Sequence, residues 1–277
     1  MGSPRGRLLT LAIALAAMAV ALFPIYWMVM TSMLPTSLML SRTPPLLPPL
    51  GAVTLDAYFG VFQRKPVATW IANSVTVTAA TTAVTITVSA MAGYSLSRYR
   101  TRIQQWAGFG LLASKMLPPT LTIIPLFILF SFSGLVETRI GLATALSATA
   151  TPFATWMLKG FFDAVPNELE QAAKIDGCGE LQAFLYVALP IIRPGLAAVA
   201  AYVAIIAWAD LVFSRTLMSR PEHWLMTVGL QSFTGEYLVD WASLMAAATI
   251  SLVPVTVLFF FLEPFLVKGM TKGSMAN

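Results

Sequence analysis

Residues 70–96 read WIANSVTVTAATTAVTITVSAMAGYSL, and no charged residue occurs between Lys65 and Arg98. An apolar run of about 20 residues is long enough to cross the hydrocarbon of a bilayer as a helix. Valine and threonine alternate here as they do in strands, but a lone strand in lipid would leave its backbone groups unpaired at high cost. The stretch is therefore predicted to be a membrane-spanning helix.

Small residues indicate a packing face on this helix. Ala79 with Ala83, and Ser89 with Gly93, stand four positions apart, which places each pair on one side of a helix. Small side chains let the backbone of a second helix approach closely. We therefore expect another span to pack here.

The composition of the whole chain agrees with a membrane protein. Of its 277 residues 57% are hydrophobic and only 10% are charged, whereas soluble domains carry about 25% charged residues. This excludes a water-soluble enzyme. The net charge of +5 is attributed to membrane orientation rather than to nucleic-acid binding. One cysteine, Cys178, and one histidine, His223, exclude an intramolecular disulfide and a multi-histidine metal site, so we expect no metal.

Long intervals between charges predict an all-α polytopic membrane protein with six spans, forming one membrane domain over residues 1–277. The spans are placed at about residues 8–33, 70–96, 106–131, 140–158, 191–214 and 241–262. The first resembles a secretory signal near Ala17 and Ala19, but its apolar run continues to Met33, so a retained helix is expected. Six spans put both termini on one side.

The basic residues indicate which side that is. With the termini in the cytoplasm, ten of the 17 Lys and Arg residues fall in cytoplasmic segments and six in outer segments, while Lys115 lies within a span. Cytoplasmic loops of membrane proteins carry an excess of Lys and Arg. Both termini are therefore predicted to be cytoplasmic. The cytoplasmic ten are Arg5, Arg7, Arg98, Arg100, Arg102, Lys159, Lys174, Arg193, Lys268 and Lys272.

One cytoplasmic segment, residues 163–190, is unusually long and acidic. Pro166 and Asn167 are typical helix-start residues, acidic residues follow in the first turn, and Gly177 is typical of a helix end. A second short helix is predicted to carry Leu181, Phe184, Leu185 and Ala188 and to stop at Pro190. The pattern alone fits a solvated connector and a docking element equally well. The acidic residues are Asp163, Glu168, Glu170, Asp176 and Glu180.

Residues 170–177, reading EQAAKIDG, are followed by VALP at 187–190. Together they resemble the EAA loop of the permease subunits of ABC importers. Gln171 stands where that family usually has the glutamate of EAA, and Val187 where it usually has isoleucine. The loss of the carboxylate puts a salt bridge to the ATPase subunit in doubt, and the sequence leaves open whether Glu170 replaces it.

Further stretches in the same order narrow the resemblance to sugar-importer permeases of the maltose type, the smaller partner of a heterodimer. At Ala209 that family more often has asparagine. The matching stretches are Leu55 to Tyr58, Asn73-Ser74, Met116 to Pro119, Trp208 to Asp210, Gly235-Glu236-Tyr237, Asp240-Trp241 and the tail 268–273.

The resemblance implies a type I ABC importer permease in a bacterial inner membrane, surrounded by lipid. The implied partners are a second permease, two ATPase subunits and an extracytoplasmic solute-binding protein. No nucleic acid is implied. The chain has no Gly-x-x-x-x-Gly-Lys-Ser/Thr motif, so we expect no catalysis and no bound cofactor; ATP and Mg²⁺ would bind the partner ATPases. The residues implied to contact an ATPase are Glu168, Glu170, Gln171, Ala172, Ala173, Asp176, Gly177, Leu189 and Pro190.

Sugars combine apolar faces with many hydroxyl groups, so aromatic rings and hydrogen-bonding groups in the spans are candidates for a substrate path. These are Trp156, Tyr202, Trp208 and Asp210, although interfacial or packing roles are open for the aromatic residues. The outer segment 216–239, with Gln231, Ser232 and Thr234, is predicted to contact the binding protein.

Lys115 adds an alternative substrate class. A cation near the bilayer centre costs at least about 2.5–3.5 kcal/mol, so it is expected to face protein or a water-filled path. There it would pair with a carboxylate or bind an anionic group of the substrate. The second option keeps glycerol phosphate and related phosphorylated polyols as alternative substrates.

Two other classes of protein are disfavoured. A self-contained secondary transporter would need ion-coupling carboxylates at membrane depth and usually an internal repeat, and neither is evident. An intramembrane enzyme would need a catalytic constellation, but His223 lies in an outer loop and the spans contain no HExxH motif or paired carboxylates.

Overall fold

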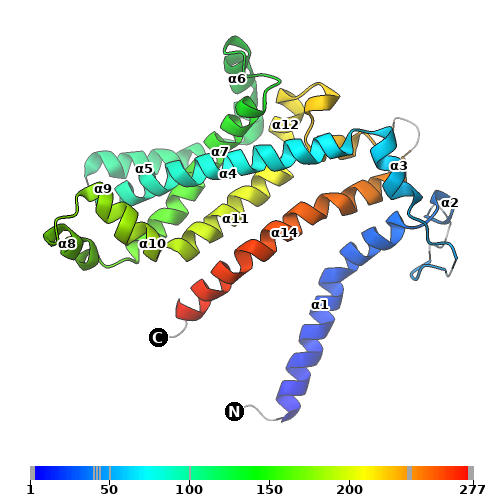
Figure 1. Ribbon diagram of the computed structural model, residues 1–277, viewed down its shortest axis with the longest axis horizontal. Coiled ribbons are helices and arrows are strands. Elements are labelled where there is room, and N and C mark those ends of the chain that lie inside the picture. The colour runs from blue at the N-terminus through cyan, green and yellow to red at the C-terminus, as the bar shows by residue number, and fades with distance from the viewer. Residues whose placement is uncertain are drawn as a thin grey trace. The chain divides into compact units, whose positions relative to one another are not determined.

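The computed structural model is helical throughout the residues that it describes, apart from loops and an isolated antiparallel bridge between Thr234 and Val239 (Figure 1). The described residues are 4–39, 41, 43, 45–49, 51–99, 101–235 and 239–273. The chain forms two compact units. The first comprises Met1–Ala68 and Gly229–Val253, and the second comprises Thr69–Val228 and Pro254–Asn277.

The first unit contains α1 (Pro4–Ser32), α2 (Thr36–Met39) and α3 (Asp56–Arg64). Hydrogen bonds attach the proline-rich connection after α1 to the end of that helix. The Tyr26 hydroxyl donates to the Leu46 carbonyl at 2.7 Å, and the backbone N–H of Thr54 donates to the Met33 carbonyl at 2.9 Å. Ser32 and Tyr58 share a hydroxyl hydrogen bond of 2.6 Å, which joins α3 to α1.

The second unit is built on α4 (Val67–Arg98) and α7 (Arg139–Asp163), which pack side by side and run in the same direction (Figure 1). Thr81 donates to the Ala143 carbonyl, and Ser89, two turns later, donates to the Thr151 carbonyl. At Gly93 a Cβ atom would lie 3.0 Å from backbone atoms of the opposite helix, so the two backbones are in near contact.

The predicted packing face is thus confirmed for one of its two pairs. Ser89 and Gly93 are buried against α7, whereas Ala79 and Ala83 are exposed and line a separate groove. The difference follows from the helical period, since positions 79 and 83 fall on another side of the helix than positions 89 and 93.

Shorter helices complete the second unit. They are α5 (Arg102–Ser114), α6 (Pro119–Phe132), α11 (Arg193–Ala209), α12 (Val212–Leu217) and the 3₁₀ turn η2 (Pro221–His223). The helices α13 (Met226–Gln231) and α14 (Trp241–Gly273) each pass from one unit to the other. Two apolar clusters form the core, one around Leu142, Leu146 and Phe213 and the other around Leu158, Phe162 and Val203.

Three helices in the described part of the chain are long and apolar enough to cross a membrane. They are Gly6–Ser32, Val67–Arg98 and Trp241–Phe261, which correspond to the first, second and sixth predicted spans. The predicted fourth span lies within α7. The fifth begins in a pair of helical segments, Glu180–Ile191 and Arg193–Ala209, that bend by 78° where they join.

Two predicted spans are not continuous helices. The third, 106–131, is divided into α5 and α6 by residues 115–118, because Pro118 and Pro119 lack the N–H groups that a continuing helix needs. The fifth, 191–214, is interrupted at Asp210 and Leu211. There the Asp210 carboxylate accepts hydrogen bonds of 2.8 Å from the backbone N–H and the hydroxyl of Ser214, which satisfies a donor in the first turn of α12.

Candidate functional site

The acidic loop folds into α8 (Asn167–Ile175), α9 (Glu180–Ala183), one π-helical turn η1 (Phe184–Ala188) and α10 (Leu189–Ile191). The predicted start at Asn167 is confirmed. Gly177 follows α8 with φ +93°, the left-handed conformation that favours glycine at a helix end. The predicted second helix is wrong in detail, because its middle is a π-helical turn and helical structure continues past Pro190 to Ile191.

The predicted docking residues divide between exposed and buried positions. Glu170 alone among the acidic and amide candidates is buried, with 5% of its surface exposed. Its neighbour Gln171 is exposed, because adjacent residues of an α-helix point about 100° apart. Glu170 therefore does not occupy the surface that Gln171 presents. Of the other candidates, Glu168, Ala172, Asp176 and Gly177 are exposed, and Ala173, Leu189 and Pro190 are half-buried.

Glu170 is held by Arg98, the last residue of α4. The guanidinium donates from Nε at 2.8 Å and from a terminal nitrogen at 2.7 Å to the same carboxylate oxygen of Glu170. The Tyr94 hydroxyl donates to the other oxygen at 2.7 Å. The ion pair is nearly enclosed, with side-chain exposures of 12% and 6%.

Arg98 also binds the chain between α7 and α8. Its terminal nitrogens donate to the carbonyls of Phe162 at 3.0 Å and Val165 at 3.1 Å. Carbonyls near the end of a helix lack intrahelical partners, and a cation there also complements the helix dipole. Arg98 thus joins α4, the end of α7 and α8 at one point. We call Tyr94, Arg98 and Glu170 the inner cluster.

An aromatic group supports the inner cluster from behind. The Tyr94 ring lies 5.4 Å from the Phe162 ring and 4.8 Å from the Phe184 ring, measured between centroids. Phe184 belongs to the π-helical turn, so this contact brings the second half of the loop to the same place. Such aromatic pairs add to the stabilisation that burial provides.

The opposite side of the loop exposes apolar side chains. Ile175 is 87% exposed, and Leu169, Leu181 and Tyr186 are also exposed. Glu180 accepts hydrogen bonds from Tyr99 and from Lys174, and these hold the pKa of its carboxyl below the ordinary value. The same contact with Glu180 raises the pKa of Tyr99. Exposed apolar side chains outside the predicted spans are typical of a protein contact surface.

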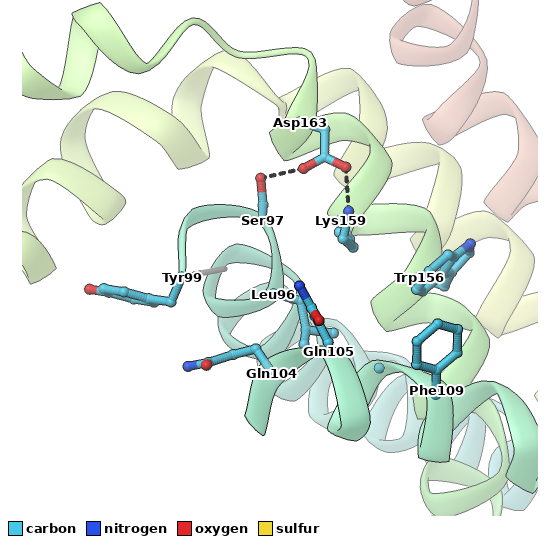
Figure 2. A pocket seen from close by; sticks show the side chains of 10 residues that line it. Leu96, Ser97, Tyr99, Gln104, Gln105, Phe109, Trp156, Lys159 and Asp163 are labelled. Atoms are coloured by element: carbon cyan, nitrogen blue, oxygen red, sulfur yellow. Dashed lines mark hydrogen bonds and ion pairs between the residues drawn. The ribbon is translucent and has the colours of Figure 1, made fainter. Parts of the chain in front are cut away.

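A cavity of about 430 Å³ lies beside the inner cluster, between the ends of α4, α5 and α7. Figure 2 shows Ser97 and Lys159 both directed at Asp163, with hydrogen-bond distances of 2.7 Å and 2.5 Å. The Lys159 ammonium lies 5.6 Å from the centre of the Trp156 ring, which forms part of the wall. Ser97 and Asp163 thus make a second polar link between α4 and α7.

The predicted substrate-path residues do not meet in one cavity. Trp156 lines the cavity just described, whereas Trp208 lines a groove of about 740 Å³ between α4, α11 and α14. Thr78 and Thr82 line that groove too, and neither hydroxyl has a hydrogen-bond partner in the described part of the chain. Tyr202 packs on Phe153 with ring centres 4.9 Å apart.

The two charged candidates are engaged in local contacts. Asp210 accepts the hydrogen bonds from Ser214 that begin α12. Lys115 stands at the break after α5, and its ammonium donates to the Thr149 carbonyl of α7. Lys115 is exposed and its observed partner is a backbone carbonyl rather than the predicted carboxylate.

The predicted binding-protein segment is held by short-range hydrogen bonds. Gln231 and Thr234 are exposed, and the Thr234 hydroxyl donates to the Gln231 carbonyl at 2.6 Å. Ser232 is half-buried and donates to the Gly229 carbonyl at 2.7 Å. Glu236 and Tyr237 lie outside the described residues.

The sequence analysis gave no structural role to the polar and aromatic side chains at the two ends of α4, although it named Asn73 in a matching stretch and Arg98 among the basic residues. Tyr94 and Arg98 stand one helical turn apart at the end of an uncharged span, a spacing that could have identified them. At the other end, Trp70 donates to the Pro221 carbonyl at 2.8 Å, and Asn73 donates to the carbonyls of Glu222 and Trp224 at 3.0 Å.

Comparison with known proteins identifies the family. Residues 85–272 match the family described as binding-protein-dependent transport system inner membrane component. The maltodextrin transport system permease protein of Bacillus subtilis is 32% identical over 80% of this chain and 81% of its own. The trehalose transport system permease protein of Mycobacterium tuberculosis is 31% identical over 92% of both.

A solved structure has the same fold. It is the crystal structure of a bacterial ABC transporter involved in the import of the acidic polysaccharide alginate. One of its chains is similar over 95% of this chain and 98% of its own, with a TM-score of 0.79 and 21% identity. The chain described here therefore belongs to the binding-protein-dependent transport system inner membrane components, the non-catalytic permease subunits of ABC transporters.

Proposed function

We propose that this chain is one of two different permease subunits of an ATP-driven importer that carries a sugar of disaccharide or oligosaccharide size. Support for the substrate class comes from the maltodextrin and trehalose permeases, to which the chain is similar over most of its length. In this proposal the chain crosses the bacterial inner membrane six times, with both termini in the cytoplasm.

The observation that carries the proposal is the two-sided character of the acidic loop. One side of α8 is attached to the spans through Glu170, while the other side exposes Leu169 and Ile175, with Leu181 on α9. A short helix anchored in this way suits a contact with an ATPase subunit. The chain has no phosphate-binding loop of its own, so the energy for import comes from that partner.

The remaining partners follow from the orientation. The second permease completes the path, and the solute-binding protein docks on the outer face at Gln231, Ser232 and Thr234. The groove beside Trp208 is the part of this chain best suited to the sugar, because the Trp208 ring lines it and can pack against an apolar face of a sugar. ATPase closure then moves the helices as rigid bodies between inward and outward openings.

A co-purification experiment tests the ATPase contact. The tagged chain, expressed with the rest of its complex, should retain an ATPase subunit in detergent. Ile175→Asp combined with Leu181→Asp should lose it, because charged groups in an apolar contact are costly to bury. Val53→Asp is the matched control, since Val53 is exposed and lies outside the acidic loop. Retention by the double variant contradicts the proposed contact.

Uptake by proteoliposomes tests the substrate class. Proteoliposomes that contain the complete complex, supplied with its binding protein, should accumulate maltotriose or trehalose when ATP is present. They should not accumulate either sugar when ATP hydrolysis is blocked. Uptake of glycerol 3-phosphate alone would select the phosphorylated-polyol alternative. Accumulation without ATP would contradict an ATP-driven importer.

A further inference from the structure

The inner cluster has a geometry that an ordinary surface contact of α8 would not need. Glu170 uses both carboxylate oxygens, one for two hydrogen bonds from Arg98 and the other for one from Tyr94. Both Arg98 donors converge on one oxygen and Tyr94 donates to the other, so the carboxylate is held from two directions by hydrogen bonds to a charged group, which are the stronger kind. The position of α8 relative to α4 is therefore defined by directional bonds.

The bonds of Arg98 extend this constraint to α7. The carbonyls of Phe162 and Val165 hold the same guanidinium, and Ser97 next to it accepts a hydrogen bond of 3.1 Å from it and donates one to Asp163 of α7. A displacement of α8 away from α4 would leave two charges nearly enclosed and unpaired, which is far more costly than breaking an exposed pair.

Other polar contacts of α8 lack this property. Lys174 pairs with Glu180 at 3.1 Å, but both side chains are well exposed and both lie in the loop itself. That pair connects the two halves of the loop and does not reach the spans. Among the ion pairs of the described residues, Arg98 with Glu170 is the one that joins α8 to α4.

We propose that Arg98 and Glu170, oriented by Tyr94, are positioning residues that make α8, α4 and the end of α7 move as one body when the ATPase subunits close. The inference rests on the proposed function. It also assigns the acid of the EQAA stretch a role inside this chain, where Glu170 couples the loop to the spans while Gln171 faces the partner.

Distance measurements test directly whether the contact of Arg98 with Glu170, called the joint below, holds α8 to α4. Cys178 is the sole cysteine of the sequence. It lies two residues after Asp176, the C-cap of α8. A second cysteine at Val84 of α4, which is exposed and does not line the groove beside Trp208, gives a pair for spin labels in the complete complex. With the joint intact, the distance distribution should be the same without nucleotide and with ATP and vanadate. In Glu170→Gln, which keeps the shape and an acceptor oxygen but removes the charge, the distribution should shift or broaden with nucleotide.

A coupling assay provides the second readout. We expect uptake per ATP hydrolysed to fall at least about tenfold in Glu170→Gln, because tenfold corresponds to about 1.4 kcal/mol and losing one partner of a buried pair costs more than that. The exchange Arg98→Glu with Glu170→Arg should recover part of the coupling. Lys174→Gln is the control, because Lys174 pairs with Glu180 within the loop, both side chains are exposed, and that pair does not reach α4 or α7.

The outcomes separate a joint from a purely structural role and from a failure of the proposed function. If the variants lower uptake and ATP hydrolysis in the same proportion, or leave the label distances unchanged, the joint is overturned. If the label distance already changes with nucleotide in the doubly labelled chain that keeps Arg98 and Glu170, the joint is overturned as well. If no ATPase co-purifies with the unaltered chain, the proposed function itself fails.

Discussion

The two ends of α4 are attached to the rest of the second unit by different chemistry. At its beginning, Trp70 and Asn73 donate to backbone carbonyls between Pro221 and Trp224, and the Ser74 hydroxyl accepts from the backbone N–H of Met226 at 2.8 Å. At its end, Arg98 binds the Glu170 side chain. The beginning of α4, which is its outer end in the proposed orientation, thus holds a loop by neutral hydrogen bonds to its main chain. The end of α4, which is its inner end in that orientation, holds a helix by a specific charge pair.

This difference in chemistry distinguishes two tasks: main-chain hydrogen bonds fix a loop, and a buried ion pair couples two helices. Bonds to main-chain groups tolerate sequence changes in the loop and release little energy individually. A buried ion pair adds little net stability compared with apolar packing, but it penalises every arrangement in which the partners separate. The contacts at the outer end fix the position of a loop, whereas the ion pair at the inner end keeps α8 and α4 in one relative arrangement.

The largest expected effect comes from removing the inner cation. Arg98→Ala leaves Glu170 charged and nearly enclosed, so the free energy of unfolding of the purified complex should fall by about 3–5 kcal/mol. Denaturant titration in detergent, followed by tryptophan fluorescence, measures it. A loss below about 1 kcal/mol, the value typical of exposed pairs, would remove the distinction between the two ends.

A smaller effect is expected at the outer end. Asn73→Ala removes two hydrogen bonds and leaves the Glu222 and Trp224 carbonyls without this donor, which should cost about 1–3 kcal/mol. The same titration reports it, and limited proteolysis of segment 219–226 should accelerate. Coupling of uptake to ATP hydrolysis should remain close to normal, in contrast to Glu170→Gln. Uncoupling by Asn73→Ala would contradict the assignment of roles.

Acidification should weaken the outer end through Glu137. Burial raises the pKa of this carboxyl, but hydrogen bonds from His223 and from the backbone N–H groups of Ser219 and Arg220 outweigh it and hold the pKa below the ordinary value. The resulting stabilisation is complete above the unfolded pKa of about 4.3 and is lost as the pH falls through the folded pKa.

The stability of the unaltered chain should therefore decline more steeply below about pH 4.3 than that of Glu137→Gln. Thermal unfolding followed across a pH series would show it. Parallel pH curves for the two proteins would mean that Glu137 stabilises the outer loop no better than a neutral amide.

The smallest effect is expected at an exposed pair. Lys174→Gln breaks the contact with Glu180, and because both side chains are in contact with solvent, the free energy of unfolding should change less than in any of the other variants. High salt should reduce even this difference, because exposed charges are screened. A loss as large as that of Arg98→Ala would show that burial does not separate the two pairs.

Local sequence patterns were sufficient to predict the helices whose limits depend on nearby residues. The uncharged run 70–96 predicted α4 to within a few residues, and Pro166, Asn167 and Gly177 predicted both limits of α8. The interruption of the fifth predicted span at Asp210 was not foreseen, because it depends on a side chain that starts a new helix and so competes with continuation of the old one.

The inner cluster could not be located from the sequence because its members are far apart in the chain. Arg98 and Glu170 are separated by 72 positions, and only the packing of α4 on α7 brings them together. The sequence also could not decide which way Glu170 points. That direction follows from how the ends of α7 and α8 are arranged around Arg98, and burial then leaves Gln171 on the outside.

The near contact of backbones at Gly93 has a mechanical consequence. Two helices joined at several points resist bending more than separate helices do, and here Thr81 and Ser89 before Gly93 and Ser97 after it each donate a hydrogen bond to α7. A displacement applied at one end of α4 is thus transmitted to the other end by α4 and α7 together, with little bending of either helix. A bulkier side chain at position 93 would push the two backbones apart, and the two helices would then bend independently.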